Sequence, residues 1–65
     1  MRIRVYHVRI PAMSTVGYGE GYDPEDRPVT FLGDHRPMRD LGRAIHHATE
    51  PISVEVEPWQ IVEGQ

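Results

Sequence analysis

The stretch Arg2-Ile3-Arg4-Val5-Tyr6-His7-Val8-Arg9-Ile10 decides how this chain folds. Its apolar and polar side chains alternate, which is typical of a β-strand because successive side chains point to opposite faces of a sheet. The alternation changes phase along the stretch, since Ile3 and Val5 fall on one face whereas Val8 and Ile10 fall on the other. We therefore predict a central strand whose apolar face changes between Val5 and Val8.

Residues 52–61, Ile-Ser-Val-Glu-Val-Glu-Pro-Trp-Gln-Ile, show the same change of phase across a Glu-Pro step. An antiparallel pairing that aligns the two phase changes also places opposite charges face to face, and each such pair contributes about 0.2–1 kcal/mol. The predicted pairs are Ile3 with Ile61, Val5 with Trp59, Val8 with Val56, Ile10 with Val54, His7 with Glu57 and Arg9 with Glu55.

The remaining elements follow from turn signals and periodicity. Residues 12–28 are rich in glycine and tyrosine and predict a long connecting loop. Residues 29–32 predict a second strand, and Asp34 predicts the N-cap of a helix over about 35–48, where Met38, Leu41 and Ile45 recur at helical spacing. The predicted fold is α+β: a small three-stranded antiparallel sheet in the order 2-1-3, with one helix on one face and ββαβ topology.

Composition limits the classes of protein that this chain can represent. Its 65 residues predict a single domain over 1–65, which buries only about 60% of its unfolded surface. Cysteine is absent and all seven basic residues are arginine, a bias that indicates a GC-rich coding sequence such as that of an actinobacterium or its phages. No apolar run approaches the roughly 20 residues of a membrane span. We expect a cytoplasmic protein, of the bacterium itself or of the host cell if a phage encodes it.

Chemistry-bearing motifs are few. Ser14 and Ser53 lie in no recognisable nucleophile context, and a domain of this size offers little cavity volume, so we expect no enzyme activity and no cofactor. The adjacent His46 and His47 point about 100° apart on a helix and cannot easily face one metal ion, so we also expect no metal. The predicted function is therefore non-enzymatic binding, by a bacterial or phage-encoded accessory factor.

The two phase changes predict where a partner would dock. One helix can cover only one face of a three-stranded sheet, and the other face would carry an exposed apolar patch. Such patches are usually interaction sites, and tryptophan is favoured at binding hot spots. The predicted partner-binding residues are Ile3, Val5, Trp59 and Ile61, with Tyr18 and Tyr22 displayed by the loop. The partner would be another protein or a second copy, whereas matched β-bulges would instead rotate the patch back into the core.

The outer face of the predicted helix supports an alternative function. Arg36, Arg39 and Arg43 recur at spacings of three and four and could contact the phosphates of a nucleic acid. Against this reading, Asp40 lies four residues after Arg36, and the net charge of the chain is −3. Pairs at that spacing are a routine feature of solvated helix surfaces.

Overall fold

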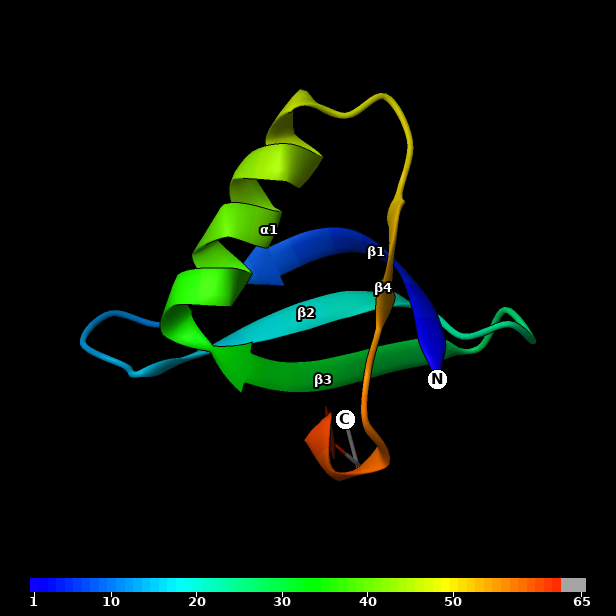
Figure 1. The fold of residues 1–65 in the computed structure, drawn as a ribbon, viewed down its shortest axis with the longest axis horizontal. Helices are drawn as coiled ribbons and strands as arrows, with labels where there is room; N and C mark the ends of the chain where they lie inside the picture. The colour runs from blue at the N-terminus through cyan, green and yellow to red at the C-terminus, as the bar shows by residue number, and fades with distance from the viewer. Residues whose placement is uncertain (63–65) are drawn as a thin grey trace.

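The computed structural model describes residues 1–62, which form a five-stranded antiparallel sheet with one helix lying across it (Figure 1). The strand order is β4-β1-β2-β3-β5. The predicted three-stranded sheet with order 2-1-3 and ββαβ topology is therefore wrong. The elements are β1 (Arg2–Arg9), β2 (Val16–Tyr22), β3 (Pro28–Asp34), α1 (His35–His47), β4 (Ile52–Glu55), the 3-10 helix η1 (Pro58–Gln60) and β5 (Ile61–Val62).

Strand β1 lies between β4 and β2, whereas β2 is the central strand of the sheet. β1 contains the change of apolar phase that the sequence shows, and a β-bulge causes it. Against β2, Val5 pairs with Gly21 and His7 pairs with Glu20, which leaves Tyr6 as the extra residue. A bulge of this kind turns the strand by one position. Val8 therefore packs on the same core as Val5, while Tyr6 is exposed. The structure thus shows in β1 the alternative of a bulge that returns apolar side chains to the core.

The predicted loop over residues 12–28 is also wrong, because its middle forms strand β2 between two hairpin connections. Three glycines alternate along this strand and are all buried: Gly17, Gly19 and Gly21. A Cβ at Gly19 would overlap the ring of Phe31, and one at Gly17 would press on Met38. The missing side chains thus let the Phe31 ring and the helix lie directly on the backbone of β2.

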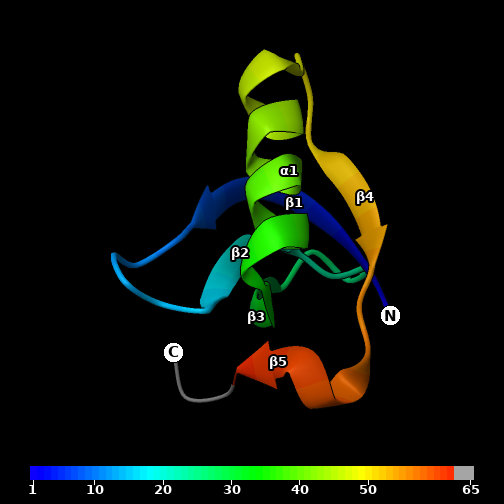
Figure 2. The ribbon, with the colours of Figure 1, turned by 60° about the vertical axis from the view of Figure 1, so that its left-hand side comes forward.

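The two edge strands, β4 and β5, follow one another in the chain but lie at opposite edges of the sheet (Figure 2). Figure 2 shows the link between them curving around the end of the sheet, and this link includes Val56 and η1. The predicted register between the first and last strands is wrong: β1 pairs with β4 through Ile3 with Val54 and Val5 with Ile52. The second phase change marks the end of β4 and the start of η1.

The core lies between the helix and the inner face of this curved sheet. Helix α1 begins and ends within one residue of the predicted bounds, because Met38, Leu41 and Ile45 face the sheet at helical spacing. Within the part of the chain that the structure describes, no helix has the length and apolar composition needed to cross a membrane. The fully or nearly fully buried side chains are Ile3, Val5, Phe31, Met38 and Val56.

Candidate protein-docking site

The predicted apolar patch does not exist as one surface, because Ile3 and Val5 lie in the core whereas Trp59 lies exposed on η1. Ile3 and Val5 are 0% exposed and form the centre of the core. Ile61 is half-buried, pairs with Phe31 and packs against the same core. Trp59 is 78% exposed, which is unusual for the largest apolar side chain of a small domain. The assignment of Ile3 and Val5 to a partner-binding surface is therefore corrected, and Trp59 is the member that remains on the surface.

Trp59 is held in place by its neighbour Gln60. The backbone N–H of Glu57 donates to Oε1 of Gln60 at 2.8 Å, and Nε2 of Gln60 donates to the carbonyl of Leu32 at 2.8 Å. The N–H of Gln60 also donates to the carbonyl of Glu57 at 2.9 Å. One amide side chain thus closes η1 on itself and ties it to β3. The exposed indole is carried by a fixed turn rather than by a free loop.

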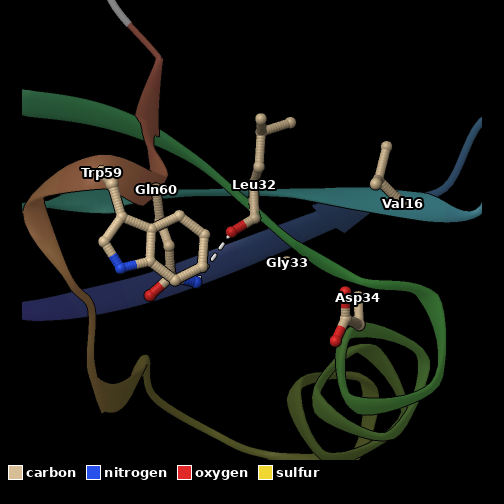
Figure 3. A pocket seen from close by; sticks show the side chains of 6 residues that line it. All are labelled: Val16, Leu32, Gly33, Asp34, Trp59 and Gln60. Atoms are coloured by element: carbon tan, nitrogen blue, oxygen red, sulfur yellow. Dashed lines mark hydrogen bonds between the residues drawn. The ribbon is translucent and has the colours of Figure 1, made fainter.

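Beside Trp59 the surface forms a hollow of about 190 Å³ (Figure 3). Figure 3 shows Trp59 and Gln60 at one end, Val16 and Asp34 at the other, and Leu32 between them. Leu32 and Val16 reach this side of the sheet because they alternate with the inward-facing glycines of β2 and β3. The residues that line the hollow are Val16, Leu32, Gly33, Asp34, Trp59 and Gln60.

A second, larger hollow of about 320 Å³ opens between the helix and the sheet. It shares Gly33, Asp34 and Gln60 with the first hollow, so the two meet across the end of β3. Its lining is mainly apolar, and its charged residues are both acidic, namely Asp34 and Glu55. The full lining is Phe31, Gly33, Asp34, Pro37, Met38, Leu41, Val54, Glu55 and Gln60.

The two carboxylates of these hollows differ in their surroundings. Glu55 accepts a hydrogen bond from the Met1 ammonium at 2.7 Å, which holds its pKa below the ordinary value of 4.5, and the charge of Arg2 adds to the effect. Asp34 is exposed and stands at the N-cap of α1, but its side chain makes no capping hydrogen bond. Among residues 1–62, Asp34 forms no ion pair either. The carboxylate of Asp34 is therefore the negative charge of the two hollows that has no positive partner within the described residues.

The tyrosines assigned to partner binding lie on the outer face of β2. Tyr18 is half-buried, with the guanidinium of Arg9 4.7 Å from the centre of its ring, and it pairs with Leu32 across β2 and β3. Tyr22 is 39% exposed and stacks on Tyr6 with ring centres 5.4 Å apart. Tyr18 is thus continuous with the hollow through Leu32, whereas Tyr22 belongs to a separate aromatic pair.

The three arginines of the alternative nucleic-acid-binding site, Arg36, Arg39 and Arg43, lie on α1. All three are exposed, and within the described residues none of them forms an ion pair, although Asp40 lies four residues after Arg36. No three His, Asp or Glu side chains of residues 1–62 come together as a candidate metal centre. The absence of a metal remains a prediction.

Comparison with known proteins finds no relative of this chain. No family model, no curated protein and no solved structure matches the chain. The site therefore rests on its own geometry. Sequence reasoning missed five of its members, Val16, Leu32, Gly33, Asp34 and Gln60. The alternation of Val16 and Tyr18 with glycine along residues 16–22 was a signal that could have shown the outward face.

Proposed function

We propose that this chain is a small non-enzymatic binding protein that docks on another protein through the surface centred on Trp59. That surface comprises the exposed indole, the hollow beside it and the adjoining Tyr18. The observation that carries the proposal is the exposure of Trp59, 78%, on a turn that Gln60 holds in place. A rigid aromatic side chain beside an apolar hollow is a typical anchor of protein interfaces, because little conformational entropy is lost when it is covered.

The size of the hollow supports a binding role over catalysis. Pockets that enclose small molecules usually measure about 300–1,000 Å³ and bury most of their ligand. The hollow beside Trp59, at about 190 Å³, is smaller than that, and the adjoining hollow, at about 320 Å³, is at the lower limit of that range. The polar side-chain groups of the hollow beside Trp59 are one carboxylate, one amide and the indole N–H of Trp59, and the amide is already hydrogen bonded to Leu32. The arrangement suits contact with another surface.

The test compares variants of the immobilised chain as baits in an extract of an actinobacterium. Trp59→Ala should lose a partner that the wild-type chain retains. Tyr6→Ala, which removes another exposed aromatic ring away from the hollow, should retain it. Circular dichroism establishes that all three baits are folded. A set of retained proteins that is the same for Trp59→Ala and wild type would contradict the proposal.

A second candidate function is nucleic-acid binding by the face of α1 that carries Arg36, Arg39 and Arg43. The observation that favours it is that these three guanidinium groups are exposed and unpaired within the described residues, so phosphates could reach them. Binding of duplex or single-stranded DNA should then be measurable at low salt, weaken steeply as salt rises, and vanish when all three arginines are replaced by glutamine. Absence of binding at low salt would remove this candidate.

A further inference from the structure

The hollow beside Trp59 has the size of a single side chain rather than of a metabolite. Its volume is about 190 Å³, below the usual range of ligand pockets. Its walls are of two kinds: apolar surface from Val16, Leu32 and the indole, and the free carboxylate of Asp34. An occupant that matches both walls carries a long apolar stem and a positive charge.

Charge decides between the possible occupants. Asp34 has no partner among residues 1–62, whereas the Met1 ammonium already offsets the charge of Glu55 in the adjoining hollow. The lining of both hollows includes no basic side chain. The nearest arginine in sequence, Arg36, is exposed on α1 and forms no ion pair with Asp34. A negative side chain would therefore be repelled here, and a neutral one would leave the carboxylate without a counter-charge.

Between the two common cations, the chemistry of the walls favours arginine. A guanidinium is planar, stacks on an indole face and can bind a carboxylate through two parallel hydrogen bonds. An ammonium offers a single compact charge and no flat surface. Arginine is also less strongly hydrated than lysine, so covering it against Leu32 and Trp59 costs less free energy.

We propose that the hollow beside Trp59 receives one arginine side chain from the partner protein, with the guanidinium between the indole of Trp59 and the carboxylate of Asp34. This inference rests on the proposed function and names the chemistry by which that docking surface recognises its partner. The stem of the arginine lies on Leu32 and Val16. The surface selects an exposed arginine with apolar neighbours.

The test uses a short peptide with blocked ends, in which one arginine is flanked by leucines. Trp59 is the sole tryptophan of the chain, so its fluorescence reports occupancy of the hollow directly. We expect a saturable change in fluorescence with the arginine peptide. Replacing the arginine by citrulline, which has nearly the same shape and no charge, should weaken binding by about two- to fivefold, because an ion pair with an exposed carboxylate contributes no more than this.

The matched variants are Asp34→Asn and Asp40→Asn. Asparagine is as good an N-cap as aspartate, so Asp34→Asn leaves α1 intact while removing the charge. It should weaken binding of the arginine peptide by the same factor of about two- to fivefold and leave binding of the citrulline peptide unchanged. Asp40 is exposed on α1 and lines neither hollow, so Asp40→Asn should bind like wild type.

Three results would overturn the inference: equal affinity for the arginine and citrulline peptides, no effect of Asp34→Asn, or no saturable change at all. In the experiment with immobilised baits, Trp59→Ala could lose the partner while Asp34→Asn retains it. In that case the inference fails and the proposed function stands. Self-association of the wild-type chain that disappears in Asp34→Asn, measured by sedimentation, would assign the arginine to a second copy and contradict a separate partner.

Discussion

Gly19 shows how a single absent side chain sets the shape of the sheet. The ring of Phe31 lies directly over it, on the strand next to its own, so any Cβ at this position would overlap the ring. Glycine weakens strands in general because it loses more backbone entropy on folding and offers no side chain to pack. In β2 this cost is offset by the burial of Phe31, which is 2% exposed.

The first prediction compares two glycines. Gly19→Ala should destabilise the fold by about 1–3 kcal/mol, because an added methyl group in a packed core forces neighbours to move. Gly42→Ala is the control: its Cβ would meet Val8 at an ordinary 3.4 Å, and alanine is favoured in helices by up to about 1 kcal/mol. Urea denaturation measures both. Equal effects of the two substitutions would contradict the placement of Phe31 over Gly19.

A second prediction separates core from surface. Ile3→Ala should cost about 2–5 kcal/mol in the free energy of unfolding, because Ile3 is 0% exposed and the substitution leaves a cavity. Trp59→Ala should change that free energy by only about 0.5 kcal/mol, as surface substitutions usually do. The same denaturation measurement checks both. A large loss of stability in Trp59→Ala would show that the indole is needed for folding and would remove the reason to assign it to docking.

At the scale of elements, the helices and strands that can be predicted from the sequence are those with a regular apolar pattern. The helix was predicted closely because Met38, Leu41 and Ile45 repeat at its period. Strand β2 was missed because glycine is depleted in strands and its alternation reads as a flexible loop. The register of β1 could not be derived, since the bulge at Tyr6 depends on which strand lies beside it. Because the predicted register was wrong, Ile3 and Val5 were wrongly assigned to the docking patch.

The link between η1 and β3 provides the third prediction. Gln60→Leu removes the donor to Leu32 and the acceptor for Glu57, and it leaves a partly buried carbonyl unsatisfied. A loss of about 1–3 kcal/mol is expected, together with weaker binding at Trp59. Gln60→Glu keeps the acceptor but, when ionised, cannot donate to Leu32. Its destabilisation at neutral pH should therefore diminish as the carboxyl is protonated. The measurement is the unfolding free energy of Gln60→Glu relative to wild type at pH 7 and at pH 4. An equal destabilisation at both pH values would contradict this role of Gln60.

At the scale of the whole molecule, an ion pair joins the first residue to an edge strand. The carboxylate of Glu55 lies 2.7 Å from the Met1 ammonium and 3.8 Å from Nη2 of Arg2. Its folded-state pKa is lowered from 4.5, so the pair stabilises the fold above the unfolded-state value. That contribution is lost as the pH falls below about 4.5 through the folded-state pKa.

The fourth prediction follows from the loss of this stabilisation at low pH. Glu55→Gln should be less stable than wild type at pH 7, and the two should converge as the pH is lowered below about 4.5. The other carboxylates titrate in both proteins, so the difference between the two unfolding free energies isolates Glu55. A difference that stays constant from pH 7 to pH 3 would show that the pair has no energetic role.

The contact between Val56 and Met1 has a consequence for the order in which the sheet can form. Its side chain is 1% exposed, and its backbone exchanges hydrogen bonds with that of Met1, since its N–H donates to the Met1 carbonyl and its carbonyl accepts from the Met1 nitrogen. The two residues are 55 positions apart in the chain, so this contact at the outer edge of β1 joins distant segments. Contacts between distant residues form slowly because closing a long loop costs entropy, so we expect β4 to join β1 after the hairpins of β1, β2 and β3 have formed.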